Sequence, residues 1–410
     1  MLRAFQAYGR ETFSSLRVRN YRLYFIGQVI SVTGTFMQAI AQDWLVYSMT
    51  HSPTLLGIVA AIQYLPLLVL GPWGGVIADR FPKRRMLIAT QTIFGVLALI
   101  LGLLTLLGWV QLWMVIVLAL CFGLTNVVDN PSRQSFIVEM VGKDEVRNAV
   151  TLNTSLVNLA RVLGPAMAGV LIAGVGMAPC FLLNALSYIA VIVMLLLMRS
   201  QGIEMSQPSQ HQGGQLQEGF RYVWKTPVLR NALLLMAVLG TMTYEFQVSL
   251  PPLAQRVFHG DAGTYAALSA ATGLGSVMGG LLTARRHQAT VALVASAGLG
   301  LGFAVCLAAL MPTFILALLA LVVAGFFSNQ FIALGNSTLQ INSDPRLRGR
   351  VMSYWAMAFL GSTAVGGPIV GWISAALGPR FGLLAGGVAA VLAGLTFGWQ
   401  ERRKIMRRQG

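Results

Sequence analysis

The chain is poor in acidic, histidine and thiol side chains. Of its 410 residues only 13 are Asp or Glu, 4 are His and 3 are Cys. Cys121, Cys180 and Cys306 lie far apart in apolar segments, and the histidines are isolated, so neither a metal site nor His-based catalysis is indicated. The sequence also lacks a Gly-x-x-x-x-Gly-Lys-Ser/Thr loop and a His-Glu-x-x-His pattern. We therefore expect no metal, no cofactor and no enzyme activity.

Long apolar segments fill the chain instead. Hydrophobic side chains make up 56% of the sequence and charged ones only 10%, which excludes an ordinary soluble globule. A membrane-spanning helix needs about 20 mainly apolar residues. Twelve such segments lie near 22–47, 53–77, 86–108, 111–130, 149–176, 179–198, 229–250, 264–284, 289–310, 313–336, 350–376 and 379–399. The sequence predicts an all-α polytopic membrane protein with twelve transmembrane helices.

The net charge of +16 has a pattern along the chain. If the N-terminus is cytoplasmic, 26 of the 29 Lys and Arg residues fall on cytoplasmic segments, and only Arg161, Arg256 and Arg380 do not. The positive-inside rule then predicts that both termini are cytoplasmic. Bases distributed in this way reflect orientation and contact with anionic membrane lipids, so we expect no nucleic-acid partner.

A polar linker divides the chain. Between residues 199 and 227 the composition changes to Gln, Ser, Gly and Pro, and the segment ends in a short amphipathic stretch. We expect an N-terminal six-helix bundle over 1–198, a cytoplasmic linker with a short amphipathic helix over 199–227, and a C-terminal six-helix bundle over 228–410. Gly164 and Pro165 recur as Gly367 and Pro368, which suggests that the two halves are repeats.

The segment between the second and third spans carries the first family resemblance. Gly75-x-x-x-Asp79-Arg80-x-x-Lys83-Arg84-Arg85 resembles the helix 2–3 signature of the major facilitator superfamily, although Pro82 and an extra position replace the usual Gly-Arg pair. The resemblance implies a gate that stabilises the outward-facing state, formed by Asp79, Arg80 and Arg84 with Asp129 of span 4. Anchoring to lipid headgroups is the alternative role for these bases.

Further stretches extend the resemblance over the whole chain. Gly164, Pro165 and Gly169 lie in a segment that is similar to the antiporter motif of exporters in this superfamily, and they would permit close packing and a helix bend. A passive kink is the alternative. Residues 130–134, 158–165 and 218–223 look like the enterobactin-exporter and macrolide-efflux branch. The resemblance implies a secondary transporter of the bacterial cytoplasmic (inner) membrane.

Polar residues inside the spans suggest a cavity between the halves. Span 1 carries a polar stripe at steps of three and four residues that includes Gln38 and Gln42, and a helix with such a stripe must turn it to water or to protein. Hydrogen bonding between helices is the alternative use of such stripes. Arg161 could bind an anionic cargo or form a static ion pair. The candidates for cavity or substrate contacts are Arg161, Gln38, Gln42, Asn158, Tyr244 and Asn329.

Two carboxylates within spans are candidates for proton coupling. Charged groups in a membrane are costly and must be offset by partners or water. Glu245 of span 7 is the better candidate and Asp43 of span 1 the weaker one. A carboxyl group that is withdrawn from water binds a proton more readily and could carry it across. A permanently paired or solvated carboxylate is the alternative in each case.

Together these features predict a monomeric secondary transporter that exports small amphiphilic compounds, drug-like or metabolic, by alternating access while protons run inward. Its partners would be membrane lipids, a small-molecule substrate and protons. One alternative is a siderophore or organic-anion exporter, in which Arg161 contacts the cargo. Another, of a different class, is a non-transporting membrane sensor or lipid-handling protein.

Overall fold

The computed structural model describes residues 13–199, 215–283, 290–344 and 347–409, and every regular element in these ranges is helical. Within these ranges twelve helical segments are long and apolar enough to cross a membrane, as the sequence predicts. The elements in chain order are η1 (Ser14–Arg17), α2 (Arg19–Thr50), α3 (Pro53–Arg80), α4 (Lys83–Leu106), α5 (Leu112–Val175), α6 (Ala178–Leu196), α7 (Gln215–Lys225), α8 (Pro227–Met242), α9 (Phe246–Pro252), η2 (Leu253–Val257), α10 (Ala262–Thr283), α11 (Val291–Leu310), α12 (Phe314–Asn342), α13 (Arg348–Ala356), η3 (Met357–Gly361), α14 (Thr363–Ala376) and α15 (Pro379–Gln409).

Spans 4 and 5 differ from the sequence prediction. They form the two parts of α5, Leu112–Gly142 and Glu145–Val175, so most of the expected loop between 130 and 149 is helical. The two parts meet at Gly142, whose φ of 69° is favourable only for glycine. The kink turns the chain back so that two antiparallel spans follow each other with almost no loop.

Spans 7 and 11 are interrupted helices. In span 7 the chain leaves the α-helical form between α8 and α9, and the span ends in the π-helical turn η2. In span 11 the π-helical turn η3 joins α13 to α14. Such breaks within a membrane are tolerated where the freed backbone groups are buried in protein or line a cavity. They are also frequent at functional sites.

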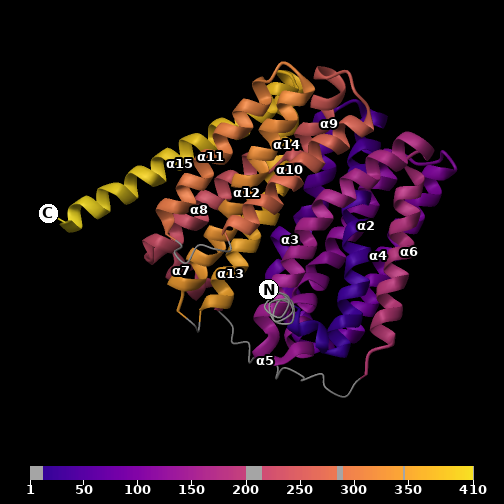
Figure 1. Ribbon diagram of the computed structural model, residues 1–410, viewed down its shortest axis with the longest axis horizontal. Coiled ribbons are helices and arrows are strands. Elements are labelled where there is room, and N and C mark those ends of the chain that lie inside the picture. Colours follow the sequence, from indigo (N-terminus) through magenta and orange to yellow (C-terminus); the bar gives the residue numbers. More distant parts are fainter. Residues whose placement is uncertain (1–12, 200–214, 284–289, 345–346, 410) are drawn as a thin grey trace, which may run out of the picture.

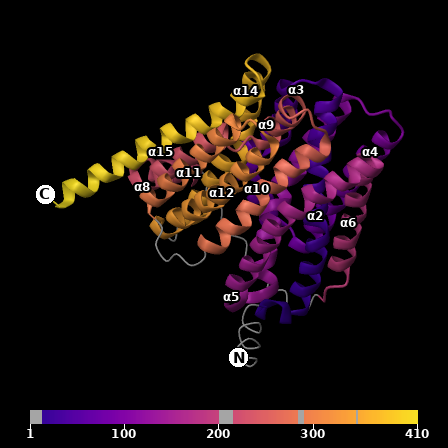
Figure 2. The ribbon, with the colours of Figure 1, turned by 45° about the horizontal axis from the view of Figure 1, so that its top comes forward.

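The spans of residues 19–196 lie on one side of the molecule and those from residue 227 onward on the other (Figure 1). We call the end of the bundle with Leu196 and Gln215 the linker end, and the opposite end, with Thr50 and Pro53, the far end. Helices α3 and α14, and α5 and α10, make the main contacts between the halves. Figure 2 shows from a second direction that α15 projects beyond the neighbouring spans toward the C-terminus.

Small residues bring the halves together at the far end. A Cβ atom added at Gly57 of α3 would lie 2.5 Å from the Gly367 carbonyl carbon of α14, and one added at Gly169 of α5 would lie 3.0 Å from the Ala266 Cβ of α10. At the linker end, a Cβ added at Gly75 or Gly349 would meet no atom within 4 Å. The halves are therefore closely packed at the far end and apart at the linker end.

The outer faces of the spans are strongly apolar. Val170, Leu281 and Ile315 are each more than two-thirds exposed, and many other large apolar side chains are exposed around the bundle. A soluble protein does not expose so much contiguous apolar surface. These faces are the ones that lipid chains cover.

Candidate functional site

A cavity of about 230 Å³, which we call the central cavity, is lined mainly by the N-terminal half, with Gln247 as its lining residue from the other half. Its walls come from α2, α3, α5 and α9, and they combine amides, one carboxylate and aromatic rings. The residues that line it are Thr35, Phe36, Gln38, Ala39, Gln42, Asp43, Val59, Ala60, Gln63, Tyr64, Phe122, Asn126 and Gln247. Amides and aromatic side chains together suit a small ligand with both polar and apolar parts.

A second cavity, of about 440 Å³, follows the first toward the linker end. On α3 the lining passes from Gln63 and Tyr64 in the first cavity to Leu67, Gly71 and Gly75 in the second. The lining of α5 continues in the same direction, and α12, α13 and η3 supply the opposite wall. The two cavities therefore follow one another along the seam between the halves, with the larger one at the linker end, and we call the two together the path.

Two contacts between the halves close this path at the far end. The Tyr265 hydroxyl of α10 donates a hydrogen bond of 2.8 Å to a carboxylate oxygen of Asp43 of α2, and its ring stacks on Trp44. The guanidinium of Arg256 donates a hydrogen bond to the carbonyl oxygen of His51. Asp43, a proton-coupling candidate, thus lines the central cavity and also takes part in closing its far end.

Arg161 lies beside the central cavity. Its guanidinium carbon lies 5.8 Å from the centre of the Phe36 ring, which forms part of the cavity wall. One turn away, Asn158 accepts a hydrogen bond of 3.2 Å from Asn329 of α12, across the seam. These three candidates are therefore brought together on the α5 and α12 side of the path.

Glu245 lies at the break between α8 and α9. The residue is only 1% exposed and its carboxyl group lies near Thr363 of α14, but neither carboxyl oxygen makes a well-formed hydrogen bond with the described residues. Its backbone carbonyl accepts hydrogen bonds from the amides of Val248 and Ser249 in α9. The hydroxyl of the neighbouring Tyr244 donates to the Ser328 carbonyl of α12. An ionised carboxylate buried in this way lacks the strong partners that would offset the cost of its burial.

The polar stripe of α2 is divided between several partners. Gln42 donates a hydrogen bond to Gln63 of α3, and both line the central cavity. Gln38 also lines the cavity but accepts a hydrogen bond of 2.7 Å from Asn184 of α6. The stripe therefore serves both roles considered from the sequence, the cavity and the joining of helices within one half.

The described partners of Asp129 lie on α4 and on its own helix, and its place in a gate of the outward-facing state stays a prediction. One of its carboxylate oxygens accepts hydrogen bonds from Thr90 and Gln91 of α4, and the other pairs with Arg133 at 2.6 Å. Arg133 also donates to Gln28 of α2. This buried network binds three helices of the N-terminal half to one another near the linker end.

The hairpin bases make separate contacts. The Lys83 ammonium donates to the Ala78 carbonyl, and Arg84 donates to the carbonyls of Leu195 and Leu196 at the end of α6. Arg80 and Arg85 are exposed at the linker end. The side chain of Asp79 lies outside the part of the structure that is described, and Gly75 lines the larger cavity.

The residues of the candidate bend motif pack closely. A Cβ at Gly164 would lie 2.5 Å from the Phe36 Cβ of α2, and Gly169 contacts α10 of the other half. Pro165 lies inside the continuous second part of α5. The motif thus lets α5 approach both a helix of its own half and one of the opposite half.

Several residues of the site give no signal in the sequence. Gln63, Gln247 and Tyr265 are single polar side chains on otherwise apolar helices, and such side chains produce no periodic pattern. Tyr64 lines the central cavity, and the charged groups near it are those of Asp43, Glu245 and Arg161. Among the described residues, no group of three or more His, Cys, Asp or Glu side chains could hold a metal ion.

Comparison with known proteins points to a single superfamily. A family model described as "Transmembrane secretion effector" matches residues 10–406. The chain is 26% identical over 377 residues to the enterobactin exporter EntS of Shigella boydii serotype 4, covering 92% of this chain and 90% of that protein. It is also 28% identical over 176 residues to the staphyloferrin A transporter of Staphylococcus aureus, covering 43% of this chain and 44% of that protein.

Solved structures show the same fold at lower sequence identity. A bacterial homologue of the human lysosomal transporter Spinster, in an inward-facing and unoccupied conformation, matches with a TM-score of 0.75 and 16% identity, covering 93% of this chain and 97% of that one. A D-xylose–proton symporter matches with a TM-score of 0.71 and 14% identity over 94% of this chain and 97% of its own. Both structures are of major facilitator transporters, so the likeness shows this fold for the chain.

Proposed function

The chain belongs to the transmembrane secretion effector family of the major facilitator superfamily, as a multi-pass transporter of the bacterial inner membrane, and we propose that it exports a small organic anion of the siderophore type. The observation that carries the proposal is the central cavity with Arg161 beside its wall. Arginine cannot lose its proton, so it attracts an anionic group of the cargo in every step of the cycle. Both relatives described above handle siderophores, which supports the same class of cargo.

The proposed mechanism is alternating access by a monomer. The linker and both termini face the cytoplasm in this proposal, because that orientation places nearly all lysines and arginines on the cytoplasmic side. The path along the seam is then open inward, and the far-end contacts of Asp43 and Gly57 must separate for release to the outside. Cargo binding favours the switch only if the cargo contacts the two states differently.

Proton coupling through Glu245 is part of the proposal. We infer that its buried carboxyl group, which makes no well-formed hydrogen bond with the described residues, takes up a proton from the outside in the outward-open state. Loss of that proton to the cytoplasm from the inward-open state then completes its inward movement. Each unit of pH difference then supplies about 1.4 kcal/mol for transport. Asp43 is a second candidate, although its hydrogen bond to Tyr265 gives it a role in closing the far end.

Transport by inverted membrane vesicles tests the proposal. We expect vesicles with the protein to accumulate enterobactin or staphyloferrin A when their interior is acidified. Arg161→Gln should abolish uptake of these siderophores and leave uptake of a lipophilic cationic dye within about twofold of wild type, because only the anionic cargo needs the guanidinium. Equal loss of both cargoes, or no siderophore uptake by the wild type, would overturn the assignment of the cargo.

A second pair of variants tests coupling separately. Glu245→Gln should remove accumulation driven by the pH gradient but retain exchange of labelled for unlabelled cargo, because exchange requires no net proton movement. Glu139→Gln, at another buried carboxyl group within a span, is the matched control and should keep gradient-driven uptake. Unchanged coupling in Glu245→Gln would transfer the role to Asp43, for which Asp43→Asn is the direct test.

A second candidate function is export of uncharged or cationic amphiphiles. Phe36, Tyr64 and Phe122 place three aromatic rings in the wall of the central cavity, and such walls accept varied apolar cargo. In that case Arg161→Gln should leave dye export intact, and wild-type vesicles should accumulate the dye but not the siderophores.

A further inference from the structure

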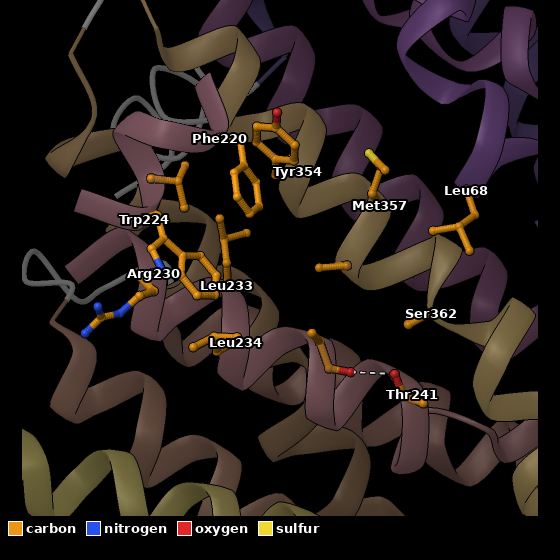
Figure 3. Close-up of a pocket in the computed structure, with 13 residues that line it drawn as sticks. Leu68, Phe220, Trp224, Arg230, Leu233, Leu234, Thr241, Tyr354, Met357 and Ser362 are labelled. Atoms are coloured by element: carbon orange, nitrogen blue, oxygen red, sulfur yellow. Dashed lines mark hydrogen bonds between the residues drawn. The ribbon is translucent and has the colours of Figure 1, made fainter. Parts of the chain in front are cut away.

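A separate apolar pocket of about 330 Å³ lies at the linker end of the C-terminal half. It is bounded by α7, α8, α13 and η3, and Leu68 of α3 closes its inner end. Figure 3 shows Phe220, Trp224 and Arg230 on one side of the pocket and Leu68, Met357 and Ser362 on the other. None of these residues lines the central cavity or the larger cavity except Met357.

The lining of this pocket, which we call the slot, extends along one membrane span. Its lining on α8 consists of Arg230, Leu233, Leu234, Ala237 and Thr241, which form one face of the helix. The eleven steps from Arg230 to Thr241 correspond to about 16 Å of helix at ~1.5 Å per residue. One leaflet contains about half of the ~30 Å hydrocarbon thickness, so the slot has the depth of a single leaflet.

The surface end of the slot is cationic. Arg230 is half-buried at the rim, Figure 3 shows its guanidinium pointing away from the apolar interior, and no carboxylate pairs with it among the described residues. Arg221 and Lys225 of the neighbouring α7 are exposed. A slot with an apolar interior and a cationic rim at one end complements a molecule with one long apolar chain and an anionic head.

Helix α7 is held firmly enough to form the wall of a specific site. Glu218 pairs with Arg350 of α13, the Phe220 ring packs edge-on against Tyr354 at 6.2 Å between centroids, and Phe220 stacks on Trp224 at 5.5 Å. These contacts fix the aromatic side chains that close the slot at the level where the spans leave the membrane. Aromatic rings are favoured at this depth of a bilayer.

We propose that this slot binds one acyl chain of an anionic phospholipid from the leaflet at the linker end, with the lipid phosphate on Arg230. The occupant is a lipid rather than a compact cargo molecule because the slot is as long as a leaflet is deep and its lining is almost entirely apolar. Because Leu68 belongs to the N-terminal half and the remaining lining residues to the C-terminal half or α7, the bound chain contacts both halves. This site is distinct from the proposed cargo site.

Native mass spectrometry of the purified full-length chain tests the proposal. The probes are phosphatidylglycerol and phosphatidylcholine with identical acyl chains. We expect one phosphatidylglycerol to be retained per protein at lipid concentrations at which phosphatidylcholine is not. Arg230→Gln should weaken retention about five- to tenfold. Arg221→Gln, which removes an equal charge from the neighbouring α7 outside the slot, should leave retention unchanged.

Two further measurements separate the slot from general surface charge. Ala237→Phe should fill the slot and remove retention of the lipid, because Ala237 lines its middle. If that variant does not fold, brominated phosphatidylglycerol should quench the fluorescence of the wild type more than that of Trp224→Phe. Equal retention of the two lipids, equal loss in Arg221→Gln and Arg230→Gln, or displacement of the lipid by transported siderophore would each overturn the proposal.

Discussion

Replacing Gly57 by valine should shift the transporter out of the conformation described here. A Cβ at this position would lie 2.5 Å from the carbonyl carbon of Gly367 and 3.0 Å from the nitrogen of Pro368, and both are backbone atoms that cannot move away alone. Forcing extra carbon atoms into a packed contact typically costs about 1–3 kcal/mol. A change of this size in a two-state equilibrium corresponds to roughly 5- to 150-fold.

The direction of the shift follows from the location of the contact. Gly57 lies at the far end, where the halves are closely packed, so valine there disfavours closure of that end. Gly75 and Gly349 lie at the linker end, where added atoms would meet nothing within 4 Å in this conformation. Gly75→Val should therefore leave the present conformation intact and obstruct closure of the linker end.

Thiol labelling measures the two populations. A reporter cysteine at position 353 (Ser353→Cys) lines the larger cavity and is exposed in this conformation. The three native cysteines, Cys121, Cys180 and Cys306, would be replaced by alanine in the background. With a membrane-impermeant reagent supplied on the linker side, Gly57→Val should reduce the labelling rate at position 353 in proportion to the shift in population.

A matched substitution and the opposite glycine complete the experiment. Gly174→Val introduces the same side chain at a glycine where an added Cβ would meet no atom within 4 Å. In this variant the cysteine at position 353 should be labelled at the same rate as in the parent protein. Gly75→Val should label at least as fast as the parent while losing transport. Unchanged labelling in Gly57→Val, with normal folding, would refute the view that the far-end contacts hold this conformation.

Two further variants test contacts inside the protein. Tyr265→Phe keeps the aromatic ring but removes the hydrogen bond to Asp43. The loss of about 1–2 kcal/mol should slow labelling of the cysteine at position 353 roughly 5- to 30-fold. An unchanged labelling rate would show that this hydrogen bond does not stabilise the closed far end. Asp129→Ala leaves the partly buried guanidinium of Arg133 without its carboxylate, so it should reduce the free energy of unfolding by about 3 kcal/mol and lower the thermal unfolding temperature of the purified protein. Asp129→Ala combined with Arg133→Met should recover much of this loss. If the double variant shows no recovery, the pairing does not stabilise the fold.

The length of the apolar segments predicts the spans because it depends only on neighbouring residues in the chain. A chain that crosses the hydrocarbon layer must satisfy its backbone hydrogen bonds within its own helix. Each of the twelve apolar segments therefore corresponds to one of the twelve spans among the described residues. The same criterion ended span 4 at residue 130, whereas the helix continues to Gly142. A hydrophobicity scan detects the part of a helix inside lipid and not the charged turns that extend beyond it.

The cavity residues on one helix were predictable, whereas their partners on other helices were not. The three- and four-residue spacing of polar side chains on α2 identified Gln38 and Gln42, both of which line the central cavity. Tyr265 and Gln247 reach this region from the other half. Their position depends on how the two halves pack, and a periodic pattern along one helix carries no information about that packing.

The position of Asp129 illustrates the same limit within one half. The family resemblance implies a place for it in a gate of the outward-facing state, which stays a prediction. In the present conformation its oxygens accept hydrogen bonds from Thr90 and Gln91 and pair with Arg133. The pairing with Arg133 is one turn away on the same helix and could have been read from the i, i+4 spacing. The α4 partners required the packing of two helices, which the sequence alone does not contain.

The energetics of helix contacts in lipid explain why such a protein can change conformation. Lipid chains are as apolar as the helix surfaces, so no hydrophobic driving force holds the two halves together, and close contacts of small residues and a few hydrogen bonds must do so. At the far end these contacts are the glycine approaches between α3 and α14 and the bond from Tyr265 to Asp43. Each contributes only about 1–2 kcal/mol. Two conformations that exchange one such set of contacts for another therefore differ by a few kcal/mol, which lies within the range that cargo binding or one proton can supply.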